Sequence, residues 1–234
     1  MASSRQAAGE LATDLRRIFG DRLTTVAIYG AHARGEAGGP VACLCLVTHL
    51  QPVDLDACAA ELKRWHGLGL ATPLLLPLAE FEASLDAFPL EYGDILDHHV
   101  HVTGEDVLAR VRVDPADLRR ACEAQVTSHL LHLRQRYLEA QGRPAAVAAL
   151  VTDAAPAFAA LLERVASLHG TTGTDGDAAS RAGAQLAGLP DSTVAAILTL
   201  AHHGHLTAPD GARLFPEYLQ AVERLAAFID TWQG

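Results

Sequence analysis

The sequence predicts an α/β domain with a mixed sheet over residues 1–112, followed by an all-α helical bundle over residues 113–234. In the first half, extended apolar runs alternate with helical patterns, which is typical of an α/β sheet. In the second half, apolar residues recur at spacings of three and four, which indicates packed helices. Half of the residues are hydrophobic and only 5% are aromatic, a composition that favours helices over an all-β fold.

The elements of the first half follow from local patterns. Leu11, Leu15 and Ile18 recur at helical spacing, and the run that follows them stops at Gly30 as a strand would. The stretch 41–47 is apolar at nearly every position, as expected of a strand buried on both faces. The expected elements are a helix at about 5–20, strands at 24–29 and 41–47, a helix at 54–65, and strands at 73–77 and 99–102.

The second half opens with a strong helix start. Asp114 is a good N-cap, Pro115 suits the first helical position, and Asp117 adds negative charge to the first turn. Arg143-Pro144 opens a second long helix. The expected helices run from about residue 115 to Gly142, from Pro144 to beyond Val165, and over 177–187, 191–201 and 208–232.

The most informative segment is Tyr29-Gly30-Ala31-His32-Ala33-Arg34-Gly35-Glu36, followed by Cys43-Leu44-Cys45-Leu46-Val47. It resembles the signature of the nucleotidyltransferase superfamily, which has the DNA polymerase β-like fold and includes bacterial minimal and aminoglycoside-type enzymes. That signature is an apolar strand, then Gly-Ser-x-Ala-Arg-Gly, a short loop, and a strand with Asp-x-Asp. Gly30, Ala33, Arg34 and Gly35 match it in spacing.

The resemblance implies a phosphate-binding turn beside a magnesium site. A glycine at the strand end lets the backbone approach a phosphate closely, and two aspartates at i and i+2 project from one sheet face to hold Mg²⁺. It implies Gly30, Ala31, Arg34 and Gly35 as nucleotide-binding residues, with Arg34 as the phosphate contact.

The sequence departs from this signature at the positions that carry the chemistry. Ala31 replaces the serine, and Cys43 and Cys45 stand at the two metal-ligand positions if the connecting loop is one residue longer than usual. No aspartate or glutamate occurs between Glu36 and Asp54, so another strand register does not supply one. Mg²⁺ prefers oxygen ligands to thiols. We therefore expect Mg²⁺ binding to be lost, with no cofactor, no metal and no catalytic residue.

The likeness extends over about residues 10–165. Segments such as Phe88-Pro89-Leu90-Glu91 and Gly104-Glu105-Asp106 look like a subgroup of predicted bacterial nucleotidyltransferases, for which we know no established substrate. The helical half resembles the α-bundle beside the transferase domain of aminoglycoside-type enzymes.

The cysteines and histidines leave alternatives open. Cys43 and Cys45 are either small buried hydrophobes or a soft-metal or redox pair. Two histidine clusters are either structural or metal-binding, and on a strand His99 and His101 would share a face. The clusters are His98, His99 and His101, and His202, His203 and His205.

Three functions fit these observations. The first is a pseudoenzyme that binds a nucleotide or small molecule, or a protein partner. The second is an active transferase acting on a small hydroxyl or amine compound, with Glu36, Glu80 or a histidine as replacement ligands. The third is a scaffold whose helical domain forms a homo-oligomer or a toxin–antitoxin-type complex.

Composition and charge narrow the partners and the compartment. The formal net charge of −10 argues against nucleic acid and anionic membranes as partners, because phosphate contacts need a basic face. No stretch approaches about 18 uncharged apolar residues, and the N-terminus lacks a signal-peptide pattern. The four cysteines show no CxxC pairs. We expect a cytoplasmic protein with free thiols.

Overall fold

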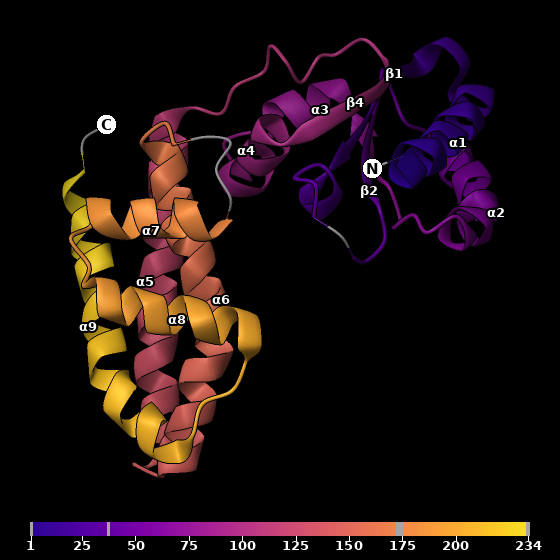
Figure 1. The fold of residues 1–234 in the computed structure, drawn as a ribbon. Coiled ribbons are helices and arrows are strands. Elements are labelled where there is room, and N and C mark those ends of the chain that lie inside the picture. Colours follow the sequence, from indigo (N-terminus) through magenta and orange to yellow (C-terminus); the bar gives the residue numbers. More distant parts are fainter. Residues whose placement is uncertain (1, 37, 172–175, 233–234) are drawn as a thin grey trace. The chain divides into compact units, whose positions relative to one another are not determined.

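The computed structural model of the chain describes residues 2–36, 38–171 and 176–232. It divides into two compact units, Met1–Asp114 and Pro115–Gly234 (Figure 1). This division lies two residues beyond the boundary that the sequence suggests.

The first unit is a four-stranded mixed sheet with helices on both faces. The strand order is β3-β2-β1-β4; β1 pairs antiparallel with β2 and β4, and β2 pairs parallel with β3. The elements are α1 (Ala2–Phe19), η1 (Gly20–Arg22), β1 (Leu23–Tyr29), η2 (Gly30–His32), β2 (Ala42–Val47), α2 (Pro52–Gly67), β3 (Leu74–Pro77), α3 (Leu78–Ala83), α4 (Pro89–Asp97) and β4 (His99–Gly104), η marking a 3-10 helix. These match the predicted order, and the fold class is confirmed.

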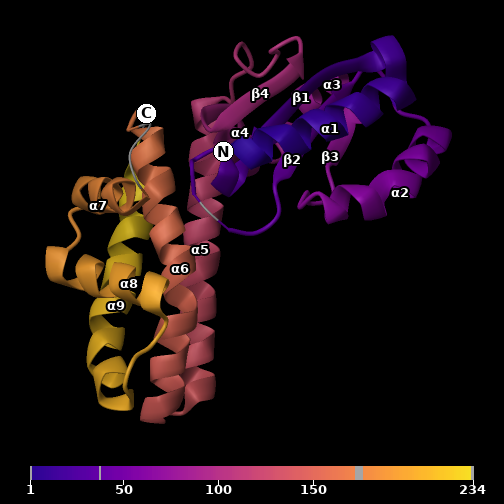
Figure 2. The ribbon, with the colours of Figure 1, turned by 45° about the vertical axis from the view of Figure 1, so that its right-hand side comes forward.

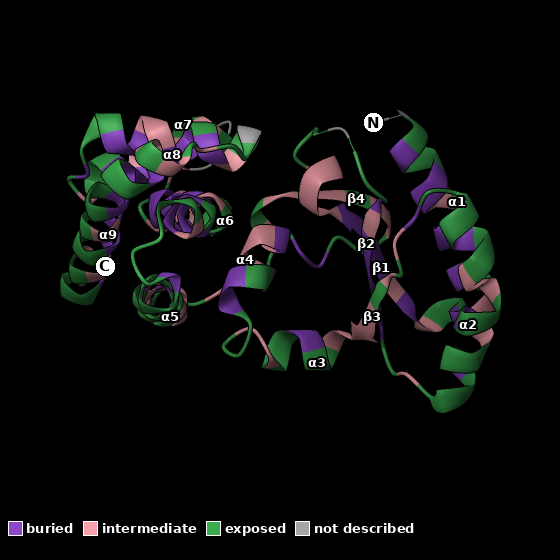
Figure 3. Ribbon diagram, turned by 90° about the horizontal axis from the view of Figure 1, so that it is seen from below, coloured by how far each residue is buried: buried purple, intermediate pink, exposed green. Residues whose placement is uncertain are grey.

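Each face of this sheet carries its own apolar core. Figure 3 shows the helices that lie on the two sides of the strands. Leu11 and Leu15 of α1 and Trp65 of α2 belong to the core on one face. The opposite face is packed by α3, α4 and the segment after β4; its buried members are Ala27, Leu44, Leu46, Phe81, Tyr92, Ile95, Val107, Leu108 and Val111. The apolar run at 41–47 is therefore explained, because β2 is central and buried on both sides.

Buried polar groups fix the two helices that cover the first face. Asp14 of α1 accepts hydrogen bonds from the indole Nε1 of Trp65, at 2.9 Å, and from Arg64. At the start of α2, both carboxylate oxygens of Asp54 accept from Arg22 at 2.7 Å. This arginine is the main reason that the pKa of Asp54 falls to about 2. A carboxylate held this way anchors the N-terminus of α2 to the end of η1.

The second unit is all helical within its described residues (Figure 2). The long helices α5, α6 and α9 pack on one another, and α7 and α8 pack against α6. A Cβ at Gly183 would lie 1.9 Å from the carbonyl oxygen of Leu162, so glycine is what allows α7 to approach α6 so closely. The bounds are α5 (Pro115–Ala140), α6 (Pro144–Leu168), α7 (Gly176–Leu186), α8 (Asp191–His203) and α9 (Ala208–Thr231).

Helix α6 is the one helix in the described residues whose length and mean hydropathy would allow it to cross a bilayer. Asp153 and Glu163 interrupt it, so it contains no uncharged apolar run of membrane-spanning length. Leu150, Val151, Phe158 and Leu162 of this helix are buried against the rest of the unit. Burial of this kind is typical of the core helix of a bundle.

Candidate functional site

The predicted phosphate-binding turn forms directly after β1. Gly30 has φ +71° and Gly35 φ +82°, in the left-handed region that glycine adopts without strain. The amides of Ala33 and Arg34 donate to the carbonyl of Gly30 at 2.9 and 3.2 Å, and the amide of Glu36 donates to the carbonyl of Ala31 at 3.0 Å. A Cβ at either glycine would meet no atom within 4 Å, so the backbone angle and not crowding favours glycine here.

His32 fastens this turn on two sides. Its Nε2 lies 3.2 Å from the carbonyl oxygen of Gly39, which can only accept. With Nε2 protonated, Nδ1 is the acceptor for the hydroxyl of Ser4 in α1, at 3.1 Å. The histidine therefore links the turn to α1 and to the loop before β2, a role that the sequence did not indicate.

Arg34, the predicted phosphate contact, is held by two carboxylates. Its Nε donates to Glu36 at 2.9 Å, and its Nη1 lies 3.1 Å from both carboxylate oxygens of Asp94 in α4. Burial lowers the pKa of the guanidinium, but the two carboxylates outweigh that effect and the net shift is upward. The arginine is therefore a neutralised cation, with 36% of its side chain exposed.

The first histidine cluster is spread over several contacts. His98 lies 3.5 Å from Asp94, and His99 contacts the carbonyl of Leu96 at 3.1 Å and Asp106 at 3.4 Å. His101 is exposed on β4. Within the described residues, no three or more histidine, cysteine, aspartate or glutamate side chains are gathered as a metal site would require.

The second histidine cluster lies at the end of α8. His202 contacts Asp177 of α7 at 2.6 Å through Nε2, and His205 is exposed in the loop before α9. The side chain of His203 lies outside the described residues. Gly204 ends the helix in the left-handed conformation with φ +59°, as a helix C-cap does.

Strand β2 shows where the predicted ligand positions lie. Cys43 pairs with Ile28 and Cys45 with Val26, and all four side chains belong to the core under α1 and α2. Leu44 alternates with them and belongs to the opposite core, together with Tyr92 and Ile95 of α4. The side chains of the two cysteines therefore lie on the face of the sheet opposite to α4, the helix that carries Asp94. Their correspondence to the metal-ligand positions stays a prediction.

Burial also changes the chemistry of the two thiols. Desolvation raises the pKa of Cys43 to about 12, and it raises the pKa of the completely enclosed Cys45 thiol well above its usual range. Both are therefore protonated near pH 7, and a protonated thiol is a poor metal ligand and a poor nucleophile.

The acids considered as replacement ligands are dispersed. Glu36 is engaged by Arg34, and Glu80 is exposed on α3. Strand β3 consists of Leu74-Leu75-Leu76-Pro77 and carries no acid. Among the described residues, Asp94 is the carboxylate that the fold brings to Arg34 from a distant part of the chain, sixty residues away in the sequence.

Comparison with known proteins supports the fold. No family model matches the chain, and no curated protein matches it by sequence. Among solved structures, it is similar to spectinomycin adenyltransferase AAD(9) from Enterococcus faecialis, whose structure was solved with ATP and spectinomycin. The TM-score is 0.56 at 10% sequence identity, over 94% of this chain and 98% of that one. The chain therefore has the nucleotidyltransferase fold with a helical C-terminal region, as its sequence predicts.

Proposed function

We propose that this chain is a non-catalytic binding protein of the nucleotidyltransferase fold whose ligand is a nucleotide or another small molecule. One observation carries the proposal: β2, the strand that follows the glycine turn, is apolar and packed on both faces. In the enzymes that the sequence resembles, this strand bears the metal-binding aspartates.

Neither face of β2 offers ligands for Mg²⁺. One face carries the protonated thiols of Cys43 and Cys45, and the other carries the aliphatic side chains of Ala42 and Leu44. Mg²⁺ takes oxygen ligands in near-octahedral geometry. The donor set of the strand therefore does not fit this ion, and the two-metal displacement of an active transferase has no support here.

The turn itself keeps one feature that suits a phosphate. Arg34 presents a planar fork of donors that pairs with phosphate oxygens in two places at once. Glu36 and Asp94 occupy that fork, so an incoming phosphate competes with both carboxylates. Because AAD(9) has been solved with ATP, a nucleoside triphosphate is the first ligand to test.

The experiment is calorimetric titration with ATP, GTP and CTP, with and without Mg²⁺. Asp94→Asn removes one competing charge, and a partly exposed ion pair of this kind contributes about 0.2–1 kcal/mol. We therefore expect Asp94→Asn to tighten nucleotide binding by up to about fivefold and Arg34→Gln to weaken it. Glu91→Gln, which removes an exposed charge from the same helix, serves as the matched control and is expected to change little.

Two outcomes contradict the proposal. Adenylyl transfer that depends on Mg²⁺ or Mn²⁺ would show that other residues hold the metal. Nucleotide affinity that is unchanged in both Arg34→Gln and Asp94→Asn would place the ligand elsewhere than this turn. Absence of binding by all three nucleotides would remove the nucleotide from the proposal and direct the search to other ligands.

A further inference from the structure

The helical unit contains a pocket of about 450 Å³ where α8 and α9 meet the loop that joins them. The apolar part of its lining comes from Ala195, Ala196 and Leu200 of α8, Leu206 of the loop, and Leu214 of α9. The small side chains of the two alanines leave room between the helices. Pockets for small molecules have volumes of about 300–1,000 Å³ and mostly apolar walls.

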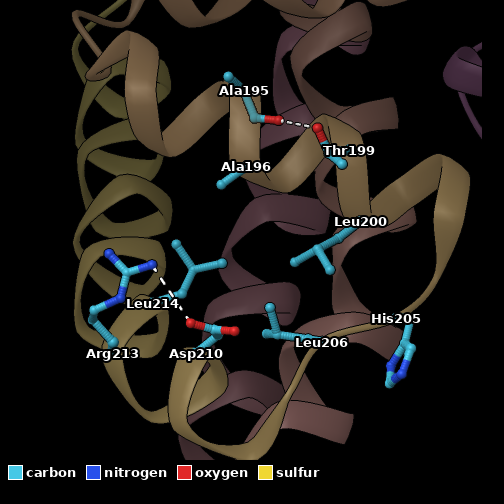
Figure 4. Close-up of a pocket in the computed structure, with 9 residues that line it drawn as sticks. All are labelled: Ala195, Ala196, Thr199, Leu200, His205, Leu206, Asp210, Arg213 and Leu214. Carbon is cyan, nitrogen blue, oxygen red and sulfur yellow. Dashed lines mark hydrogen bonds and ion pairs between the residues drawn. The ribbon is translucent and has the colours of Figure 1, made fainter.

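Polar groups stand at the edge of this apolar surface (Figure 4). Arg213 lies at one end of the row of leucines with Asp210 beside Leu214, and His205 lies at the other end. Thr199 also lines the pocket; its hydroxyl donates to the carbonyl of Ala195 at 2.9 Å. The pocket therefore offers an apolar body between polar ends, which suits a ligand with both characters.

The charges at this edge differ in how far they are engaged. Asp210 accepts a hydrogen bond from the hydroxyl of Thr207 at 2.5 Å, and Thr207 caps the N-terminus of α9. The contact between Asp210 and Arg213 is much longer, 3.8 Å, and 76% of the Arg213 side chain is exposed. A guanidinium has five donors, and one contact at this distance satisfies little of that capacity. The acid is engaged in capping, while the arginine is available to a ligand.

We infer that this pocket binds a small amphipathic anion, with its carboxylate on Arg213 and its apolar chain over Leu200, Leu206 and Leu214. An arginine fork pairs with a carboxylate in two places, and the adjacent leucines supply the energy of apolar burial. The overall net charge of −10 opposes anions in general, so the local arginine and not the global field would select the ligand. This site is independent of the glycine turn and of the function proposed for it.

The probe is octanoate, which is titrated into the protein by calorimetry. Octylammonium and octanol have the same chain length and are titrated in the same way for comparison. We expect octanoate to bind at least tenfold more tightly than octylammonium. Arg213→Gln should weaken octanoate binding at least fivefold, whereas Arg213→Lys should retain part of it. Arg224→Gln, which changes another exposed arginine of α9, is the matched control and should leave the affinity unchanged.

A second variant separates the pocket from the rest of the surface. Ala196 is partly exposed, so Ala196→Phe fills the pocket without adding a ring to the buried core. We expect it to abolish octanoate binding and to leave the titration with ATP unchanged. The inference is overturned if Arg213→Gln and Ala196→Phe both bind octanoate as tightly as the unchanged protein does. It is also overturned if octylammonium binds as tightly as octanoate. Loss of ATP binding alone would concern the glycine turn and not this pocket.

Discussion

Replacing Leu44 by alanine tests whether the sheet face beneath α4 is a filled core or a face that can open to a ligand. Leu44 has no exposed surface and packs within the core that includes Phe81 and Ile95. The substitution removes three carbon atoms, a transfer loss of about 2.4 kcal/mol at ~0.8 kcal/mol per methylene group. The cavity left in a packed core raises the total to about 3–4 kcal/mol.

The assay is urea unfolding followed by the fluorescence of Trp65, which is buried in the first unit. The background is Trp232→Phe, because these are the two tryptophans of the chain and the second lies in the helical unit. With a slope of about 2 kcal/mol per molar, the midpoint should fall by about 1.5–2 M urea.

Leu74→Ala is the matched control, since it removes the same atoms from β3 at a position that is 36% exposed. It should cost no more than about 1 kcal/mol. If Leu44→Ala costs as little as Leu74→Ala, the sheet face beneath α4 is not a packed core and can open to a ligand.

Three further expectations concern packing, thiol chemistry and pH. Gly183→Ala should destabilise the helical unit by about 1–3 kcal/mol in thermal unfolding, because the new Cβ would overlap the carbonyl of Leu162. Gly9→Ala in α1 is the control, since its Cβ has free space and should stabilise the protein by about 0.5–1 kcal/mol. Equal effects of the two substitutions would refute the close contact between α6 and α7. All four cysteines are buried, so an aromatic disulfide reagent at pH 8 should react with them only after unfolding, and rapid reaction of the native protein would argue for a thiol pair that is open to solvent. Burial lowers the pKa of His129, whose Nε2 lies 2.7 Å from the hydroxyl of Tyr218. The imidazole therefore binds a proton more readily in the unfolded chain, so stability is retained above the ordinary histidine pKa of about 6.5 and falls as the pH drops below it. His129→Gln should lose less stability than the wild type between pH 7.5 and 5.5. Equal losses in the two proteins would contradict this.

The sequence predicted the fold well because its signals are local. The alternation of apolar runs with helical patterns placed the elements of the sheet, and the start at Asp114-Pro115 placed the first helix of the bundle. Gly30 and Gly35 were informative for the same reason, since a positive φ at a strand end is a property of one residue and its neighbours.

The site was less accessible to sequence reasoning because its contacts are distant. Asp94 meets Arg34 only once α4 has packed on the sheet through Tyr92 and Ile95, and no spacing rule links residues sixty positions apart. Which face Cys43 occupies depends on the register between β1 and β2, and one residue more or less in the loop inverts it. The apolar character of β2 holds in either register, which is why the expected loss of the metal ligands does not depend on that register.

The most direct test of the account is the dependence of ATP binding and turnover on the metal. Calorimetry would compare ATP with an excess of Mg²⁺ and ATP with a chelator. Release of pyrophosphate would then be followed in the same samples after adding a set of small hydroxyl and amine compounds as acceptors for the adenylyl group. Because β2 carries no oxygen ligand on either face, we expect equal affinity in both conditions and no pyrophosphate. Affinity that rises tenfold or more with Mg²⁺, together with pyrophosphate release, would contradict it and identify the protein as a working transferase.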